Sequence, residues 1–372
     1  MKIAIRADGT DLAKARATLE KELGFGKYFA DRMFRMKYTA DKGWHDPEIT
    51  AYGPLQMDPA AMVLHYGQEI FEGQKAYKWD DGRIAMFRPD ANAARMNRSA
   101  QRLCMPPIPL EDQIEAITTL VSQLDAWIPR SPSSLYVRPT MIASEPALGV
   151  RPANEYLYFI ICSPVGPYFP KGFAPVRVKA EPAYVRAVEG GTGDAKCGGN
   201  YATSLLAQSI AKGEGFEGVL WLDAKEHRFV EEIGAMNIFF IIEGKLVTSP
   251  LHGSILPGIT RDSIINLARD EGMVVDERFL SIQEVTQGIE QGKVTEAFGA
   301  GTAAVITPVG TVGWGGADYV ISGAAVGPIT KRFYKTLTDY QYGKVQDPYG
   351  WIHTVSPAVR SKVAEDQPTG KR

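Results

Sequence analysis

The sequence predicts a protein of the α+β or mixed α/β class with two domains. Helical and strand patterns alternate irregularly, unlike the regular order of a βαβ repeat. A length of 372 residues favours two domains, since one domain takes roughly 150 residues. The segment 164–175 holds four prolines and two glycines and is the best linker candidate. We therefore expect an N-terminal α/β domain over 1–163, a linker over 164–175, a C-terminal domain over 176–355 and a flexible tail over 356–372.

The elements of the first half follow from periodicity and turn residues. The pair Asp81-Gly82 lies between two apolar runs and predicts a hairpin, because a tight hairpin turn needs residues that accept a positive φ. Apolar residues over 110–128 recur at helical spacing and predict a helix with one buried face. The runs 135–139 and 156–162 are rich in β-branched and aromatic residues and predict strands.

The second half contains the same two kinds of pattern. Glycines mark the ends of its helices, and Ser281 opens a capping box with Glu284. Strands are expected over 218–222 and 237–242, and helices over 200–212, around Ile264 up to Gly272, from Ser281 toward Gly288, and through Ile329, Phe333 and Leu337.

Composition and charge exclude several classes of function. The 41 basic and 43 acidic residues nearly balance, whereas proteins that bind nucleic acid or membrane surfaces usually carry a basic excess. The longest apolar runs fall far below the ~18 residues of a membrane helix, and the first residues do not resemble a targeting signal. Three cysteines are too few for a disulfide framework, so we expect a cytoplasmic protein. The five histidines lack the spacing of a metal site, so we expect no metal.

Lys196 stands in the segment GGTGDAKCGG, which spans 190–199 and contains five glycines. Glycines let the backbone approach a bulky planar ligand closely, and a desolvated lysine has a lowered pKa and can form a Schiff base. The spacing fits neither a P-loop nor a dinucleotide fingerprint. The alternative is a surface lysine in a flexible loop.

A Schiff-base lysine suggests pyridoxal phosphate, which also needs an acid beside its ring nitrogen and an anion site for its phosphate. Glu231 and Glu232 precede a predicted strand, so one carboxylate is a candidate for that acid, unless both are solvated turn residues. The segment 256–260 opens a helix, whose free N–H groups suit a phosphate. The segment 299–303 is a candidate for a second amide-rich site.

From about Tyr28 to about Tyr349 the chain resembles the branched-chain amino acid aminotransferases, which belong to the fold type IV group of pyridoxal phosphate enzymes. The matching blocks stand in the family's order and spacing: 71–77, 87–89 with Arg95, 135–139, 191–201, 232–237, 255–260 and 299–303. The resemblance implies a two-domain fold with the active site in the cleft between the domains and the cofactor anchored by the C-terminal domain. It also implies a ping-pong transfer, through pyridoxamine phosphate, of the amino group of leucine, isoleucine or valine to 2-oxoglutarate.

The resemblance assigns the cofactor contacts residue by residue. Lys196 would bind pyridoxal phosphate covalently and then move the substrate proton. Glu232 would pair with the ring nitrogen, and Tyr201 would hydrogen-bond the phenolic oxygen. The phosphate would be held by Arg95, by the amides of Ile259 and Thr260, and by Thr302.

The resemblance also implies a substrate pocket that accepts an aliphatic side chain and a second carboxylate in turn. Tyr136 and Arg138 would bind the carboxylate of glutamate, together with a loop around Val150 from a neighbouring subunit, so we expect at least a homodimer. The α-carboxylate would bind amides near Ala303 and Ala304. The apolar wall would consist of Tyr66, Phe71, Tyr168 and Tyr201. Without the resemblance, the sequence favours Tyr66, Phe71 and Tyr168 as plain core aromatics.

The chain departs from some family members at several positions. Ala304 and Thr307 stand where some members carry a Cys-x-x-Cys pair, so we expect no thiol switch. Ala235 replaces a threonine that some members use near the substrate carboxylate. The three cysteines, Cys104, Cys162 and Cys197, are expected to fill the core.

Two alternatives remain at this point. One is another fold type IV enzyme, either a D-amino-acid aminotransferase or an aminodeoxychorismate lyase. The other belongs to a different class: a nucleotide-binding regulator in which the glycines around Lys196 form a phosphate-binding loop.

Overall fold

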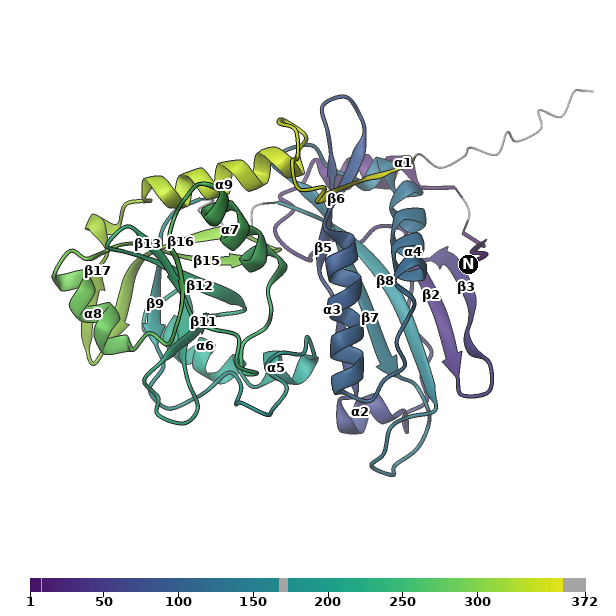
Figure 1. Cartoon of the computed structure of the whole chain (residues 1–372). Helices are drawn as coiled ribbons and strands as arrows, with labels where there is room; N and C mark the ends of the chain where they lie inside the picture. Colours follow the sequence, from purple (N-terminus) through teal and green to yellow (C-terminus); the bar gives the residue numbers. More distant parts are fainter. Residues whose placement is uncertain (8, 167–172, 357–372) are drawn as a thin grey trace, which may run out of the picture.

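The chain folds around two β-sheets that stand side by side, each with its own helices (Figure 1). This computed structural model describes residues 1–7, 9–166 and 173–356. The predicted α+β or mixed α/β class is confirmed, because both sheets contain many antiparallel pairs and helices cover their faces. None of the helices in these ranges is long and apolar enough to span a lipid bilayer.

Most of the first sheet comes from the N-terminal half of the chain. Its helices are α1 (Leu12–Leu19), α2 (Met62–Tyr66), α3 (Pro89–Arg102), α4 (Leu110–Ser122) and the short 3-10 helix η1 (Asp125–Trp127). Its strands lie in the order β1 (Ala4–Ile5), β3 (Gly43–Ala51), β2 (Arg32–Thr39), β8 (Glu155–Val165), β7 (Ser134–Ala143), β5 (Gln74–Lys78), β6 (Ile84–Phe87) and β18 (Ile352–Val355), with β4 (Glu69–Phe71) paired to β7.

The second sheet comes entirely from residues after the linker region. Its helices are α5 (Gly198–Ala202), α6 (Leu205–Gly213), α7 (Ile259–Asp270), α8 (Ile282–Glu290), the 3-10 helix η2 (Ser322–Ala324) and α9 (Pro328–Gln341). Its strands lie in the order β11 (Val230–Ile233), β10 (Gly218–Leu222), β9 (Val176–Ala180), β16 (Val305–Trp314), β15 (Val294–Gly301), β12 (Met236–Ile242), β13 (Lys245–Thr248) and β14 (Val275–Glu277), with β17 (Ala317–Val320) paired to β16.

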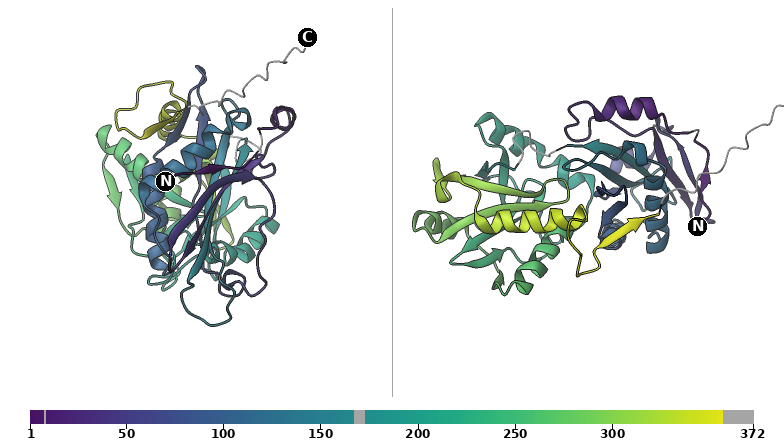
Figure 2. Two further views of the ribbon diagram at one scale, coloured as in Figure 1. Left: turned by 90° about the vertical axis from the view of Figure 1, so that its right-hand side faces the viewer. Right: turned by 90° about the horizontal axis from the view of Figure 1, so that it is seen from above.

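An apolar cluster joins the two sheets. Tyr77 and Phe87 of the first sheet belong to the same cluster as Phe239 and Phe298 of the second, and Phe333 of α9 packs with them. The view from above shows α9 running toward the first sheet, with β18 beyond it (Figure 2). Burial of this apolar surface from water stabilises the relative position of the two sheets.

Most elements form where the sequence predicts them. The predicted strands 135–139, 156–162, 218–222 and 237–242 correspond to β7, β8, β10 and β12. Ser281 caps α8, since its Oγ accepts a hydrogen bond from the N–H of Glu284 at 3.1 Å. The remaining helices predicted in the second half, around Ile264 and through Phe333, correspond to α7 and α9.

Some elements differ from the prediction. The predicted hairpin joins β5 to β6, but its turn spans 79–83, and of its residues only Gly82 has a positive φ. The helix predicted over 110–128 ends at Ser122 and continues as η1. The helix predicted over 200–212 is interrupted between α5 and α6, where the hydroxyls of Thr203 and Ser204 bond to backbone carbonyls one turn earlier.

The domain boundaries remain a prediction, and two strands do not fit the predicted limits. Strand β8 runs to Val165, and β18 pairs with β6, so residues 352–355 join the first sheet although we expected them in the second unit. Half of the predicted linker, residues 167–172, and nearly all of the predicted tail lie outside the described residues. Cys162 and Cys197 are buried as expected, but Cys104 is exposed in a turn with a φ of 53°, so its prediction as a core residue is wrong.

Candidate active site

A cavity of about 150 Å³ lies between the two sheets and is lined by residues of both. From the first sheet and its helices come β4, β7 and α3, and from the second come the lysine segment, the start of α7 and the turn between β15 and β16. Ten of the predicted site residues line it: Phe71, Arg95, Tyr136, Arg138, Lys196, Tyr201, Ile259, Thr260, Thr302 and Ala303.

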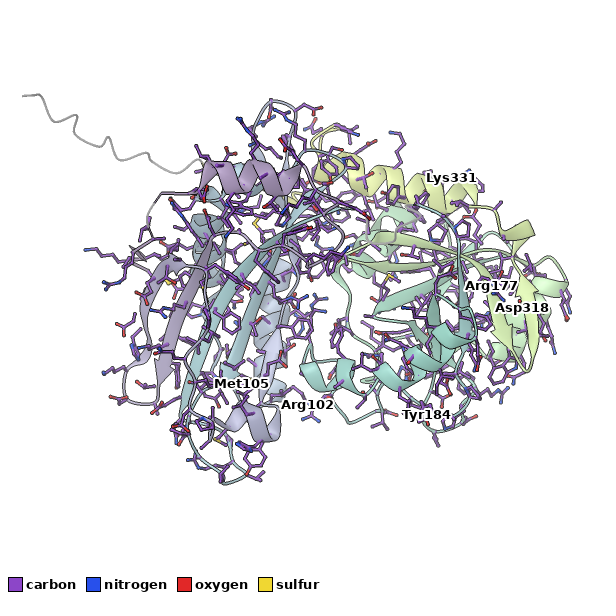
Figure 3. All side chains as sticks on the ribbon, turned by 180° about the vertical axis from the view of Figure 1, so that it is seen from behind. Arg102, Met105, Arg177, Tyr184, Asp318 and Lys331 are labelled. Atoms are coloured by element: carbon purple, nitrogen blue, oxygen red, sulfur yellow. The ribbon has the colours of Figure 1, made fainter. Side chains whose placement is uncertain are left out.

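The backbone of Lys196 is held by the first sheet. Its N–H donates to Ser99 Oγ of α3 at 2.9 Å, and its carbonyl accepts from the N–H of Phe71 in β4 at 3.0 Å. Arg102, at the end of α3, donates to the carbonyls of Gly190 and Gly191 at 2.9–3.2 Å and so holds the start of the glycine segment; Figure 3 labels it between the two sheets. The alternative of a lysine in a flexible surface loop is therefore wrong.

The amine of Lys196 is placed for nucleophilic chemistry. It donates to Tyr201 Oη at 2.6 Å and lies 4.9 Å from the centroid of the Phe71 ring. Burial, with the charge of Arg95 as a lesser cause, lowers the pKa of Lys196 to about 8. Burial also raises the pKa of Tyr201 to about 12, so its hydroxyl keeps its proton at neutral pH.

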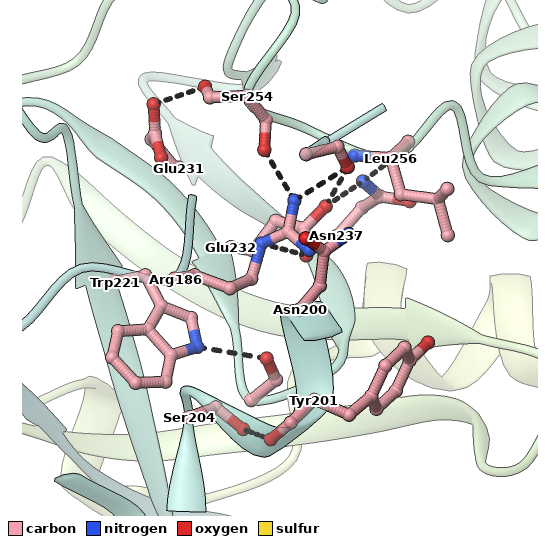
Figure 4. Close-up of polar contacts among 12 residues, drawn as sticks. Arg186, Asn200, Tyr201, Ser204, Trp221, Glu231, Glu232, Asn237, Ser254 and Leu256 are labelled. Carbon is pink, nitrogen blue, oxygen red and sulfur yellow. Dashed lines mark hydrogen bonds and ion pairs between the residues drawn. The ribbon is translucent and has the colours of Figure 1, made fainter. Parts of the chain in front are cut away.

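Glu232 lies behind the cavity wall rather than on its surface. Only 2% of the residue is exposed, and its carboxylate forms an ion pair with Arg186 at 3.1 Å and accepts from the N–H of Leu256 at 2.8 Å (Figure 4). Burial raises the pKa of Glu232, although the charge of Arg186 opposes the shift. Asn237 donates to the same carboxylate at 3.3 Å and itself lines the cavity.

The neighbouring Glu231 points to the other side of β11. It accepts from Ser254 Oγ at 2.5 Å and lies 3.2 Å from His252 Nε2. Glu231 and Glu232 are both buried within a strand, so the alternative that both are solvated turn residues is wrong. Of the two, Glu232 is the one whose partners reach the cavity.

Arg95 is already paired within the protein. Its guanidinium makes two parallel hydrogen bonds to Glu72, at 2.7 and 2.8 Å, and its third nitrogen donates to the carbonyl of Pro257 at 3.3 Å. Burial alone would raise the pKa of Glu72, but Arg95 holds it below the usual value. Asn92 donates to the same carboxylate at 2.8 Å. The ion pair fixes the orientation in which Arg95 faces the cavity.

The start of α7 is a ready anion site. No side chain caps this helix, and the residues of its first turn, Ile259 and Thr260, line the cavity. Within the described residues, the hydroxyls of Thr260 and Thr302 have no hydrogen-bond partner. At the N-cap, Gly258 packs directly against Asn237, because an added Cβ would lie 1.9 Å from Asn237 Oδ1; a larger residue would therefore push Asn237 into the cavity wall. Free amides, two hydroxyls and a guanidinium are a donor set that fits a phosphate group.

Arg138 lies on the opposite wall, between two aromatic rings. Its guanidinium carbon is 4.6 Å from the centroid of Phe71 and 5.1 Å from that of Tyr136, and it donates to Tyr136 Oη at 2.9 Å. Its Nε is buried without a hydrogen-bond partner in the described part of the chain. Phe25, from the N-terminal loop, packs edge-on against Tyr136. This wall therefore offers both ring faces and a cation.

Four predicted site residues do not line this cavity. Tyr66 and Val150 are 40% and 84% exposed on the surface of the first part. Ala304 lines a neighbouring cavity on the other side of the β15–β16 turn. Glu232 lies behind the wall, as described above, and a further predicted residue, Tyr168, lies outside the described residues.

Several residues that shape the site were not among the predictions. Glu72 belongs to a block that resembles the family, which was the available signal, but its partner Arg95 is 23 positions away. Ser99, Arg102 and Arg186 have no local pattern that would distinguish them from other serines and arginines of the sequence. Their roles depend on contacts between segments far apart in the sequence.

Comparison with known proteins places this geometry in a family. Residues 69–312 match the family model described as "Amino-transferase class IV". The "Probable branched-chain-amino-acid aminotransferase" of Streptomyces coelicolor is 51% identical over 92% of this chain and 95% of its own length. The "Branched-chain-amino-acid aminotransferase 2" of Bacillus subtilis is 49% identical over 97% of this chain and 99% of its own.

Solved structures agree with the sequence relatives. The branched-chain amino acid aminotransferase of Escherichia coli superposes with a TM-score of 0.71 and 28% identity, over 88% of this chain and 99% of that one. The "T.th." branched-chain amino acid aminotransferase, solved with pyridoxamine 5'-phosphate, has a TM-score of 0.71 and 28% identity, over 86% of this chain and 98% of that one. The expected fold type IV architecture is therefore confirmed.

The Arg95–Glu72 pair yields a prediction about stability. Glu72→Gln leaves a guanidinium buried beside a neutral group, so we expect the free energy of unfolding to fall by about 3 kcal/mol. Urea denaturation of the variant and the parent measures this difference. The control is Asp81→Asn, which breaks the exposed pair with Arg83 and should change stability little. Equal effects of the two substitutions would show that the buried pair does not stabilise the fold.

The lowered pKa of Lys196 yields a prediction about reactivity. In the protein freed of any bound aldehyde, the rate of reductive methylation of Lys196 by formaldehyde should rise as pH rises through about 8, because the neutral amine is the nucleophile. Mass spectrometry of the lysine-containing peptides follows the reaction, with the exposed Lys331 as a reference for reagent access (Figure 3). A rate for Lys196 that does not change between pH 7 and 9, approximately the range spanning this pKa, would contradict the burial argument.

Proposed function

The chain belongs to the class IV aminotransferase family, and from this premise we propose that it transfers the amino group of leucine, isoleucine and valine to 2-oxoglutarate. The products are the branched 2-oxo acids and L-glutamate, formed in a ping-pong reaction with pyridoxal phosphate as cofactor. The observation that carries the proposal is Lys196, whose amine lies beside Tyr201 in a cavity walled by Arg95 and Arg138. Family membership excludes the nucleotide-binding alternative.

The described residues fit the cofactor. The phosphate would bind Arg95, the amides at the start of α7, Thr260 and Thr302, whose donors face the cavity. Glu232, kept in place by Arg186, would stand on the side of the ring nitrogen. Once bound, pyridoxal phosphate supplies an electron sink for the bond that breaks at the substrate α-carbon.

Lys196 would carry the proton in each half-reaction. As a neutral amine it removes the proton from the α-carbon, and as an ammonium it returns one. A pKa near 8 suits both directions, because either form is then accessible at neutral pH. Tyr201 holds the amine at 2.6 Å, and the ring of Phe71 covers it on one side and keeps water away.

The Arg138 wall supports recognition of both amino-group donors. A branched aliphatic side chain can lie on the faces of Phe71 and Tyr136, which bury it without a polar partner. The second carboxylate of glutamate can bind the guanidinium of Arg138, which lines the cavity and has no carboxylate partner among the described residues. One wall thereby serves two unlike substrates in turn.

The subunit partner and the location are parts of the proposal. Helix α2 and the segment after β7 lie side by side, and Tyr66 donates to the carbonyl of Leu148. Large apolar side chains are exposed there, among them Leu64, Leu148 and Val150. Such a patch suits an interface with a second copy, whose pocket it would complete, so we propose a homodimer.

Three unpaired cysteines support a cytoplasmic location.

The catalytic role of Lys196 is tested by Lys196→Ala. We expect formation of glutamate from L-leucine and 2-oxoglutarate to fall by at least about 10³-fold, because the amine that moves the proton is missing. A dehydrogenase-coupled assay measures glutamate, and Lys212→Ala, in the last turn of α6, serves as the control. Wild-type rates with D-alanine and aminodeoxychorismate that exceed the rate with L-leucine would favour another fold type IV enzyme.

The proposed interface is tested by Val150→Glu. A buried carboxylate at the interface should shift the protein from dimer to monomer in sedimentation velocity, and the KM for 2-oxoglutarate should rise by about 10-fold as the pocket loses part of its wall. Val320→Glu, at an exposed apolar position of β17, is the matched control. A variant that stays dimeric with an unchanged KM would contradict this interface.

A further inference from the structure

Lys75 of β5 reaches from the first sheet to the second. Its Nζ donates to the carbonyl of Ala303 at 2.6 Å, and 8% of the residue is exposed. Among the described residues no carboxylate forms an ion pair with it, and burial lowers the pKa of Lys75 to about 8. A lysine buried without an acid is costly, and its hydrogen bond to the carbonyl of Ala303 offsets part of that cost.

The turn that Lys75 contacts is strained. It joins β15 to β16 through residues 302–304. Thr302 and Ala303 line the candidate active-site cavity, whereas Ala303 and Ala304 line the neighbouring cavity together with Lys75, so the turn separates the two. The N–H of Ile306 donates to the carbonyl of Ala304 at 2.8 Å, which closes a γ-turn on Val305. Val305 has a φ of 62°, in a region that β-branched residues rarely adopt. Such a conformation persists only where neighbouring groups hold it.

One peptide group connects Lys75 to the proposed carboxylate site. The carbonyl of Ala303 and the N–H of Ala304 belong to the same planar unit. A charged donor on the carbonyl polarises the unit and strengthens its N–H as a donor. The N–H of Ala304 has no acceptor among the described residues. The ammonium thus acts on an amide that is free to bind an anion.

We propose that Lys75 is a positioning residue for the substrate α-carboxylate, acting through the Ala303–Ala304 peptide, which it holds in place and polarises. It touches neither substrate nor cofactor itself. The proposal rests on the proposed function, since it presupposes a carboxylate at the turn. In this proposal a residue of the first sheet, Lys75, assists the binding of the substrate α-carboxylate, which itself contacts the β15–β16 turn of the second sheet.

The test compares two fragments of leucine on the holoenzyme. The first, 4-methylvaleric acid, has the carboxylate without the amine, and the second, 3-methylbutylamine, has the amine without the carboxylate. In Lys75→Met we expect the Kd of 4-methylvaleric acid, measured by calorimetry, to rise by about 10-fold. The reason is that the charged hydrogen bond from Lys75 to the Ala303 carbonyl, which positions the Ala304 N–H, is lost. The single-turnover rate with 3-methylbutylamine and the visible absorbance of the bound cofactor should stay unchanged.

The control is Lys78→Met in the same strand, whose amine pairs with Asp125 at 2.8 Å away from the turn; it should change neither measurement. If Lys75→Met does not fold, Lys75→Gln, which keeps a neutral donor, is measured with the same expected pattern and a smaller effect. Unchanged binding of 4-methylvaleric acid, an equal loss with both fragments, or loss of the cofactor absorbance would overturn the proposal. Failure of the wild-type enzyme to convert L-leucine would instead overturn the proposed function.

Discussion

The active site depends on the way the first sheet holds the backbone of Lys196. Ser99 accepts its N–H and Phe71 donates to its carbonyl, so a residue of the second half is fixed from the first half on both sides. Because the backbone is fixed, the amine reaches Tyr201 within a partly buried cavity, where desolvation lowers its pKa. Any loosening between the two sheets would therefore alter the chemistry of the lysine along with its position.

Two buried arginines beside the cavity are each paired with a carboxylate. Arg95 is matched by Glu72 and Arg186 by Glu232, each pair almost fully removed from water. An isolated buried ion would be costly, whereas the bidentate Arg95–Glu72 pair keeps both of its groups ionised and correctly oriented. Arg138, in contrast, has aromatic rings beside it and keeps a buried Nε without a protein acceptor in the described residues. Of these three, Arg138 is thus the arginine without a carboxylate partner in the described part of the chain, and it is also the one proposed to bind the two unlike substrates in turn.

Local pattern explains which parts were predictable from the sequence. The strand 218–222 and the cap at Ser281 depend on neighbours in sequence, and both formed as expected. The blocks that resemble the family contain most of the residues that line the cavity, so the resemblance predicted many of those residues. Other features depend on contacts between distant segments, for which a single sequence carries no periodic signal. They are the pairing of β18 with β6, the exposure of Cys104 and the hydrogen bonds from Arg102 to the glycine segment.

The return of β18 to the first sheet changes the topology of the whole molecule. Both β1 and β18 belong to that sheet, so the second half is an insertion between two of its strands, β8 and β18, tethered at two points of the chain. A body attached by two tethers can rotate mainly about the line that joins them. Any opening between the two halves would therefore have to bend the chain at both crossings, as in a hinge motion.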